Sequence, residues 1–444
     1  MSHVLHRTVR AEPELAVRGD GIMLTLADGR QIIDAAGGAA VACLGHGNAR
    51  VIEAVAAQAR QLSYIHTGFF TSAPAEALAD QILGHEPGGL TRAFFVSSGS
   101  EAMESALKMA RQYFVELGQP QRTHFISRRQ GYHGNTFGAL AASGHPARRG
   151  IYEPVLSPSF SRVSPCFAYR EQRAEESDAE YVERLAAELE AEFQRLGPDK
   201  VIAFCAETIV GAATGCVTAV PGYFKAIREV CDRHGALLIL DEVMSGMGRS
   251  GTTHAWEQEG IAPDLQAVAK GLGGGYQPIG ALLISRRVLE VLEAGSGAFV
   301  HGHTYQAHPL ACAAALEVQR IIAEEDLLAN VRAMGARLEA GLTERFGNHA
   351  HVGDIRGRGL FRALEFVADR ASKRPFDPAH GLAMRLKDAG LAKGIAAYPC
   401  SGTIDGRLGE HLIVAPPYNV TPAQIDSIVE RLGDTVETAL AGIA

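Results

Sequence analysis

Long basic runs are absent from this 444-residue chain, in which Asp and Glu outnumber Lys and Arg by 50 to 42. No run of Lys and Arg exceeds two residues, as at Arg128-Arg129. A protein that binds nucleic acid or an anionic membrane surface gathers positive charge into one patch. We therefore expect neither nucleic acid nor a membrane as a partner.

Long apolar runs are scarce as well. The first 15 residues have no apolar core of signal-peptide length, and their His, Arg and Glu residues are scattered. The nearest approach to a membrane span, Val201–Phe224, contains Glu207 and includes Pro221-Gly222 near its end. A buried strand followed by a loop explains that segment better than a membrane helix.

Paired cysteines are also lacking. The seven cysteines are odd in number, far apart and never spaced as CxxC. This pattern is typical of reduced thiols in a cytoplasmic protein and excludes a disulfide framework or a zinc cage. They are Cys43, Cys166, Cys205, Cys216, Cys231, Cys312 and Cys400.

What the chain does have is ordinary globular composition, with 47% hydrophobic and 21% charged residues. Its dominant pattern is a short apolar strand followed by a glycine-containing turn and an amphipathic helix. Strands are predicted at 93–97, 123–127, 201–206, 236–240, 265–269 and 280–285, with helices at 101–116, 178–195, 221–234 and 286–294. Continuous apolar strands between helices indicate an α/β fold with a mainly parallel sheet covered on both faces.

Changes in this strand–turn–helix pattern along the chain predict three regions. Residues 1–50 contain a hairpin, Ile22–Leu26 and Gln31–Asp34 around Asp28-Gly29, which is too short for a core of its own and must pack on the small domain. Residues 51–310 form the large domain. Residues 311–444 form a smaller α+β domain with helices at 310–324, 326–346, 379–392 and 421–440 and strands at 360–366 and 411–415.

The turn Ser97-Ser98-Gly99-Ser100 lies between a predicted strand and a predicted helix. Its small residues expose backbone N–H groups at a helix N-terminus, where the helix dipole favours an anion, so the turn could hold a phosphate. Simple N-capping by Ser98 or Ser100 is an equally good interpretation of these residues alone.

Two charged residues each follow an apolar strand. Asp241 comes directly after 236–240, and Lys270 comes directly after 265–269 and before a glycine-rich turn. A capping aspartate and a solvated surface lysine are the ordinary alternatives. At the carboxyl edge of a parallel sheet, however, both would project into the crevice that binds ligands, where a desolvated lysine can serve as a Schiff-base amine.

Three histidines, His301, His303 and His308, fall within eight residues. The spacing raises the possibility of a zinc site, but no HExxH pattern accompanies it, and a glycine-containing loop is the better interpretation. No metal is expected.

A phosphate cradle, an acid and a lysine at the same sheet edge are what pyridoxal phosphate requires. Lys270 would hold the aldehyde and move protons, and Asp241 would keep the pyridine nitrogen protonated. Tyr132, in Gly131-Tyr132-His133-Gly134, is the candidate to stack on one face of the ring, and Val243 could cover the other.

With these motifs in order, the sequence resembles the class III pyridoxal-phosphate-dependent aminotransferases, which are transferases of fold type I. The matching stretches run through most of the chain. They are 45–48, 97–102 with Glu104, Ala106 and Lys108, 131–134, 240–243, 246–251, 269–275, 302–305 with His308-Pro309, 358–360 and 415–417.

The resemblance implies a set of site residues. Lys270 and Asp241 would be catalytic, Gly99 and Ser100 would bind the phosphate, and Glu207 would line the site near the ring oxygen. Thr304 would reach the cofactor of a neighbouring subunit, which implies a homodimer with shared active sites. The full cofactor-binding set is Ser98, Gly99, Ser100, Tyr132, His133, Glu207, Asp241, Val243, Lys270 and Thr304, with Phe69 and Arg407 as candidate substrate residues.

The substrate prediction rests on two absences. Relatives that bind glutamate pair an acid after the first site Glu with an arginine before Ala-Pro-Pro, and here those positions hold Ala212 and Ile413. We expect an omega-transaminase that moves an amino group from an ω-amino acid or amine to pyruvate by a ping-pong mechanism. Arg407 is the candidate to bind the acceptor carboxylate. An aminomutase, racemase or decarboxylase, or an aminotransferase that uses 2-oxoglutarate, remains the alternative.

Overall fold

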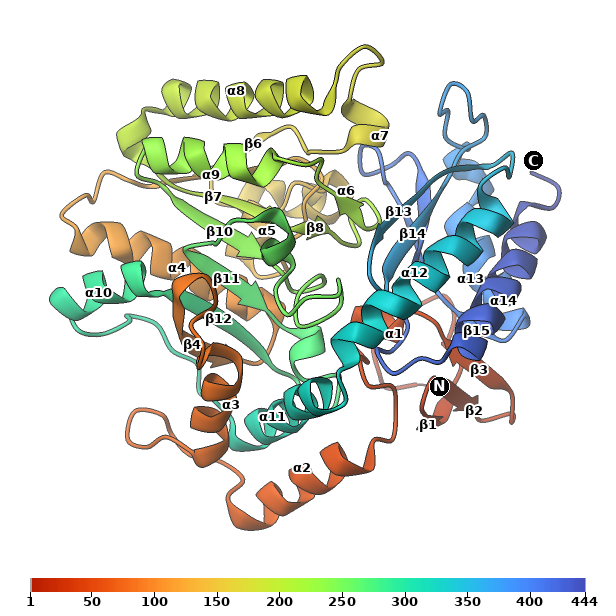
Figure 1. Cartoon of the computed structure of the whole chain (residues 1–444), viewed down its shortest axis with the longest axis horizontal. Helices are drawn as coiled ribbons and strands as arrows, with labels where there is room; N and C mark the ends of the chain where they lie inside the picture. Colours follow the sequence, from red (N-terminus) through yellow and green to blue (C-terminus); the bar gives the residue numbers. More distant parts are fainter. Residues whose placement is uncertain (1, 444) are drawn as a thin grey trace.

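The computed structural model describes residues 2–443, and its central feature is a seven-stranded sheet with the order β4-β12-β11-β10-β7-β5-β6 (Figure 1). Strand β12 runs antiparallel to both of its neighbours, and the other adjacent pairs are parallel. The strands are β4 (Leu90–Val96), β5 (His124–Arg128), β6 (Phe160–Val163), β7 (Val201–Glu207), β10 (Leu237–Asp241), β11 (Leu265–Val268) and β12 (Gly280–Ser285). The predicted α/β class and its six strands are confirmed, and β6 is a seventh that the apolar pattern did not predict.

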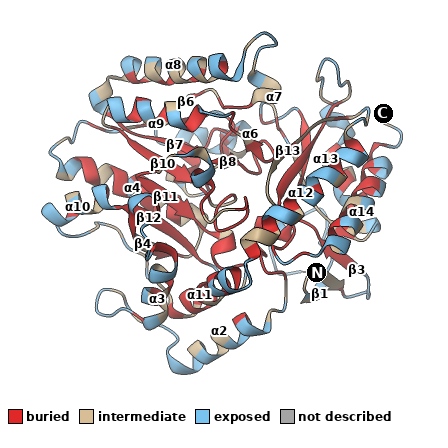
Figure 2. Ribbon diagram, in the orientation of Figure 1, coloured by how far each residue is buried: buried red, intermediate tan, exposed pale blue. Residues whose placement is uncertain are grey.

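Helices cover both faces of this sheet, and the alternation of side chains along β10 explains how. Leu238 and Leu240 point into one hydrophobic cluster, whereas Leu237 and Ile239 point into another on the opposite face. The first face is covered by α3 (Ala73–Leu83), α8 (Asp178–Leu196) and α9 (Tyr223–Arg233), and the second by α4 (Gly99–Glu116), α5 (Phe137–Ala142) and α10 (Arg286–Ala294). Strands β7, β10, β11 and β12 are buried along their whole length, and the outer faces of the helices are exposed (Figure 2).

The ten remaining strands of residues 2–443 belong to smaller sheets: two four-stranded sheets lie at the other side of the molecule (Figure 1), and β8 (Ile209–Val210) pairs with β9 (Val217–Thr218) in a two-stranded sheet. Antiparallel strands β13 (Val352–Arg358), β14 (Phe361–Phe366), β17 (Glu410–Val414) and β16 (Tyr398–Ser401) lie against α12 (Leu327–Phe346), α13 (Leu382–Ala392) and α14 (Pro422–Leu440). The N-terminal hairpin is present as β2 (Met23–Leu26) and β3 (Gln31–Asp34), preceded by β1 (Ala16–Asp20). Strand β3 pairs with β15 (Ile395–Ala396), which joins the hairpin to the C-terminal part of the chain.

Helix α11 (Pro309–Glu324) begins where the sequence changes character near residue 310. It packs on α3 and on α2 (Ala49–Gln61). Its buried residues are shared between two clusters, with Ala311 and Cys312 in the core of the large sheet and Val318 and Ile321 in the core of the C-terminal part. The helix therefore belongs to both cores at once.

None of the helices within residues 2–443 is both long enough and apolar enough to cross a bilayer.

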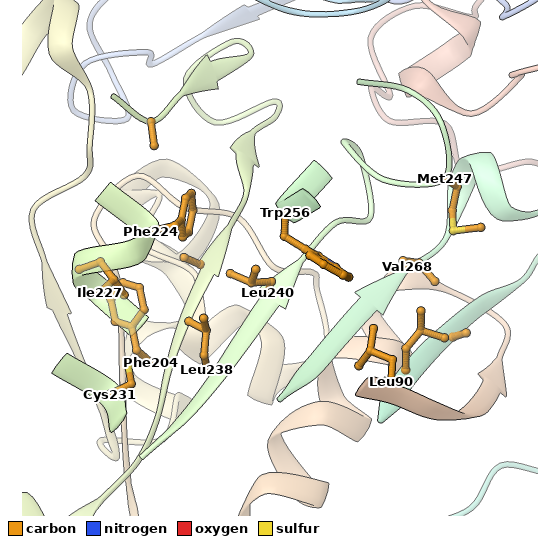
Figure 3. Packing of buried hydrophobic residues seen from close by; sticks show 14 of the residues in the cluster. Leu90, Phe204, Phe224, Ile227, Cys231, Leu238, Leu240, Met247, Trp256 and Val268 are labelled. Carbon is orange, nitrogen blue, oxygen red and sulfur yellow. The ribbon is translucent and has the colours of Figure 1, made fainter. Parts of the chain in front are cut away.

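The core of the large sheet makes one stability prediction. Phe224 of α9 is fully buried in the hydrophobic cluster that also contains Phe204 of β7 and Leu238 of β10 (Figure 3). Replacing it with alanine leaves a cavity in a close-packed interior, so Phe224→Ala should lower the free energy of unfolding by about 3–5 kcal/mol in urea titrations. Met384→Ala, at a side chain of α13 that is 59% exposed, should leave the midpoint nearly unchanged. Equal midpoints for the two variants would contradict this packing.

Candidate active site

The site is built where three parallel strands end at one edge of the sheet. In the observed register Asp241, the last residue of β10, lies beside Glu207 of β7 and Ala267 of β11. Lys270 follows β11 by two residues. Two acids and a lysine far apart in sequence thus meet because their strands run in the same direction.

Asp241 is buried and held from two sides. Its Oδ2 is 2.8 Å from Nδ1 of His133, and its Oδ1 accepts a hydrogen bond from the backbone N–H of Val243 at 3.0 Å. A carboxylate can only accept, so Nδ1 of His133 carries the proton. Burial alone would lower the pKa of His133, but the neighbouring Cys205 and the Asp241 carboxylate outweigh burial and hold that pKa well above its usual value.

Glu207 is buried beside Asp241, and its two oxygens are fixed by backbone donors. Oε1 accepts from the N–H of Tyr132 at 2.9 Å, and Oε2 accepts from the N–H of Gly211 at 2.8 Å. Burial, together with the charge of Asp241, raises the pKa of Glu207. Because Glu207 accepts from Tyr132, it also fixes the turn that carries the Tyr132 ring.

Lys270 combines a strained backbone with a perturbed amine. Its φ of 47° lies in the left-handed region, which residues other than glycine seldom adopt, and such strain is concentrated at functional sites. Nζ donates to the carbonyl oxygen of Ala39 at 2.9 Å. Burial lowers the pKa of Lys270 to about 8 against the attraction of Asp241, so a useful fraction of the amine is neutral and nucleophilic near neutral pH.

The turn at residues 98–100 forms the start of the 18-residue helix α4. The Oγ of Ser98 accepts from the N–H of Glu101 at 3.2 Å, so Ser98 is the N-cap. A Cβ on Gly99 would lie 2.8 Å from Cγ1 of Val243, which shows that only glycine allows this close approach. Capping and anion binding are therefore compatible, because the cap uses the N–H of Glu101 and not those of Gly99 and Ser100, which line the cavity.

These residues line one cavity of about 460 Å³. It brings together nine of the ten residues expected to bind a cofactor, which are Ser98, Gly99, Ser100, Tyr132, His133, Glu207, Asp241, Val243 and Lys270. Thr304, Phe69 and Arg407 do not line it in the single chain, and all three are exposed.

Several lining residues were not singled out from the sequence, among them Arg7, Arg148, Met244 and Tyr398. Arg148 stands out among them because its Cζ lies 4.4 Å from the centroid of the Tyr132 ring. It lies in the four-residue helix α6 (Pro146–Arg149), and Tyr398 opens β16. No motif marks these positions, and only the fold brings them to the cavity.

The histidines at 301 and 303 lie edge to face, with ring centroids 4.7 Å apart, and Nε2 of His301 is 3.1 Å from Oγ of Ser105. Across residues 2–443 no three side chains of the metal-ligating types come together as a possible metal site.

Comparison with known proteins agrees with this geometry. The family model for class III aminotransferases matches residues 6–436. An uncharacterised aminotransferase of Schizosaccharomyces pombe is 49% identical over 442 residues, covering 100% of this chain and 96% of its own length. A diaminobutyrate–2-oxoglutarate transaminase of Halomonas elongata is 36% identical and covers 93% of this chain and 88% of its own length.

Solved structures agree as well. An (S)-enantioselective omega-transaminase from Thermomicrobium roseum superimposes with a TM-score of 0.93 at 36% identity, covering 99% of this chain and 97% of that one. The omega-transaminase of Pseudomonas jessenii in complex with PMP gives 0.91 at 33% identity, covering 97% and 94%. The fold is that of the fold type I pyridoxal-phosphate-dependent transferases. The chain belongs to the class III aminotransferases, and its cofactor is pyridoxal 5'-phosphate.

The cavity fits that cofactor. An aldehyde requires an amine that is partly neutral, which Lys270 supplies, and a pyridine nitrogen requires a buried carboxylate, which Asp241 supplies. A phosphate requires unpaired N–H donors at a helix start, which α4 offers.

The lowered pKa of Lys270 predicts a pH-dependent stability of the cofactor-free protein. A lysine with pKa 10.5 when unfolded and about 8 when folded binds fewer protons in the folded state, so it destabilises the fold below pH 8 and ceases to do so as the pH rises through 10.5. Lys270→Met should therefore be more stable than the parent at pH 7 by about 1–3 kcal/mol, allowing for partial exposure of the amine.

The measurement is the difference in urea midpoint between the two proteins from pH 7 to pH 10, where that difference should shrink. Lys387→Met, at an exposed lysine of α13, should show a constant difference. A constant difference for Lys270→Met as well would disprove the shifted pKa.

Proposed function

We propose that this aminotransferase moves an amino group from an ω-amino acid or an amine to pyruvate by a ping-pong mechanism, with donor and acceptor using one cavity in turn. The observation that carries the proposal is the apolar wall of that cavity. Ala212 and Met244 line it, and within residues 2–443 the acids of the lining are Glu207 and Asp241 alone, both buried at the strand ends.

In this proposal, each residue has one role. Pyridoxal phosphate supplies an electron-withdrawing ring that stabilises negative charge on the substrate carbon. Lys270 would hold the cofactor covalently and, as a free amine, would accept and donate the proton at the reacting carbon. Asp241, oriented by His133, would keep the ring nitrogen protonated. Tyr132 and Val243 would enclose the ring, and Ser98, Gly99 and Ser100 would hold the phosphate.

The absence of a glutamate-binding pair supports an ω-amino acid or amine as donor. Ala212, where glutamate-binding relatives place an acid, presents only a methyl group to the cavity. Ile413, at the position of the partner arginine, is buried in β17 in a cluster with Phe361 and Ala363. A second carboxylate beside this wall would lose its hydration without gaining a partner, at a cost of several kcal/mol.

One observation favours 2-oxoglutarate as an alternative acceptor. Arg7, from the segment before β1, lines the cavity together with Arg148, so two cations could receive two carboxylates. The Halomonas elongata relative is named for 2-oxoglutarate. Arg7 is exposed, however, and an exposed cation gains less from pairing with a carboxylate than a desolvated one.

The acceptor test compares pyruvate with 2-oxoglutarate in single-turnover spectra of enzyme that has first been converted by an amine donor. We expect kcat/KM to be at least about tenfold higher for pyruvate, since an unpaired second carboxylate would be desolvated. A tenfold preference for 2-oxoglutarate would overturn the acceptor assignment and leave the family chemistry intact.

The donor side separates the alternatives within pyridoxal chemistry. Mixing the enzyme with β-alanine, 4-aminobutanoate or 1-phenylethylamine alone should shift the visible band and release the matching keto acid, aldehyde or ketone. A racemase, aminomutase or decarboxylase would release none of these products.

We also propose a homodimer with shared sites. Thr304 lies outside the cavity of the single chain, where its carbonyl oxygen accepts from the hydroxyl of Tyr64 at 2.9 Å. Tyr64 contacts Tyr305 edge to face at 5.9 Å between centroids. Phe69 and Val300 are 79% and 81% exposed, and apolar side chains left exposed in this way are typical of a subunit interface. A second copy would bring its Thr304 and Phe69 to this chain's cavity.

Shared sites predict complementation between two inactive variants. Lys270→Ala lacks the amine, and Thr304→Glu would repel the partner's phosphate, so each homodimer should be inactive. Random mixing should restore about one quarter of the parental activity, because half of the dimers are mixed and each has one intact site. The assay is activity after co-refolding, with light scattering to measure the mass. A fully active monomer of 47.2 kDa would refute the proposal.

A cytoplasmic location is part of the proposal. All seven cysteines are unpaired in the structure, and six of them are buried, which suits a reducing compartment.

A further inference from the structure

Arg148 is a pocket arginine whose guanidinium no protein carboxylate neutralises. It is partly buried at the cavity wall, and among residues 2–443 no acid forms an ion pair with it. The next residue, Arg149, shows the contrast. Its Nε and Nη2 donate to Glu153 at 2.6 and 2.9 Å, and its Nη1 donates to the carbonyl oxygen of Ser143 at 2.8 Å. Arg149 therefore stabilises the fold, whereas Arg148 forms no ion pair with a carboxylate of the described residues.

The position of Arg148 is fixed although no carboxylate of the described residues pairs with it. Its guanidinium lies over Tyr132, 4.4 Å from the ring centroid. The turn at residues 402–409 packs on the start of α6, since a Cβ on Gly406 would lie 2.8 Å from Cδ of Pro146 and 3.1 Å from the N of Ala147. An arginine that is held in place and still unpaired is suited to bind a ligand, because little conformational freedom is lost on binding.

The charge of Arg148 is felt throughout the cavity. It is one of the causes, after burial and against Asp241, of the lowered pKa of Lys270. It also opposes the rise that burial causes in the pKa of Tyr398 and Cys400. A carboxylate bound to Arg148 would cancel this field at the amine.

We propose that Arg148 binds the carboxylate of the substrates, both the keto acid and the ω-amino acid, through paired N–H···O bonds. A guanidinium offers two parallel donors that match a carboxylate, and the rings of Tyr132 and Tyr398 line the same cavity. The inference rests on the proposed function and replaces Arg407 as the carboxylate-binding residue. Arg407 is an exposed residue of the turn of residues 402–409 and lies outside the cavity lining.

The first experiment measures binding to the holoenzyme without turnover. Butanoate, a carboxylate with no amino or keto group, is titrated against the parent and Arg148→Met by calorimetry, with butanamide as the uncharged analogue. Butanoate should bind the variant about 10- to 100-fold more weakly, and butanamide should bind both equally. Arg148→Lys keeps the charge without the paired donors and should give an intermediate loss.

The second readout is the titration of the bound cofactor's visible band. Butanoate should raise its midpoint pH in the parent, because it neutralises a nearby cation, and should leave the midpoint unchanged in Arg148→Met. In steady state, Arg148→Met should raise the KM for pyruvate and β-alanine about tenfold or more, and it should lower kcat/KM for 1-phenylethylamine, which has no carboxylate, much less than kcat/KM for β-alanine.

Two further variants keep the test decisive. Arg337→Met removes an exposed arginine of α12 that pairs with Asp426, far from any proposed role, and should match the parent throughout. If Arg407→Met weakens butanoate binding and Arg148→Met does not, Arg407 holds the carboxylate and the inference is wrong. If the parent shows no spectral change with any donor, the proposed function itself fails, which is a separate outcome.

Discussion

The parallel register of β7, β10 and β11 is the constraint on which the site depends. It brings Glu207, Asp241 and Lys270 to one edge of the sheet although more than 60 residues separate the first from the last. Glu242, the residue after Asp241, stabilises the same edge of the sheet from the opposite face. Its carboxylate accepts hydrogen bonds from Thr208 Oγ1 at 2.7 Å, from the N–H groups of Ala255 and Trp256 at 2.7 and 2.8 Å, and from Gln266 Nε2 at 2.9 Å. Because successive side chains alternate, anchoring Glu242 on one face directs Asp241 into the cavity on the other.

The part of the site that sequence could predict is the part carried by strand ends and glycine turns. Asp241, Lys270 and the turn at residues 98–100 each follow an apolar strand, and that pattern is local. Arg148 could not be found this way, because it lies on a one-turn helix with no periodicity, and its place in the cavity depends on the turn of residues 402–409 from the far end of the chain. Arg7 lies in a segment without regular structure, so no pattern marks it either.

The fold shows the same division. Buried strands of the large sheet have continuous apolar sequences and were predicted within one to three residues. Strands β13 and β16 were not, because β13 is only partly buried and carries Asp354, Arg356 and Arg358, and β16 contains Pro399 at a sheet edge. Helix α2 was missed although Asn48 caps it by accepting from the N–H groups of Arg50 and Val51. Asn48 also belongs to the stretch 45–48 that resembles the family, so its residue type alone does not indicate a helix start.

Buried charge determines how the two cores fit together. Glu365 of β14 is fully buried between Arg170 and Arg356, at 2.6 Å from each, and Arg356 also donates to the carbonyl oxygen of Gly215 at 2.7 Å. Such pairs gain little net stability, because desolvation offsets most of the attraction, but removing one partner leaves an uncompensated charge. These charged groups therefore allow one arrangement of the two cores, which apolar contacts alone would not specify.

Helix α11 connects the active site to the C-terminal part across this boundary. The side chain of its Gln319 donates to the carbonyl oxygens of Gly271 and Leu272 at 3.0 and 2.9 Å, directly after Lys270, and its Val318 and Ile321 lie in the core of the C-terminal part. One helix therefore contacts both the turn after Lys270 and the core of the C-terminal part. If the C-terminal part rotates as substrates enter and products leave, α11 must move with it. Through Gln319, that movement would also displace the backbone beside the amine of Lys270.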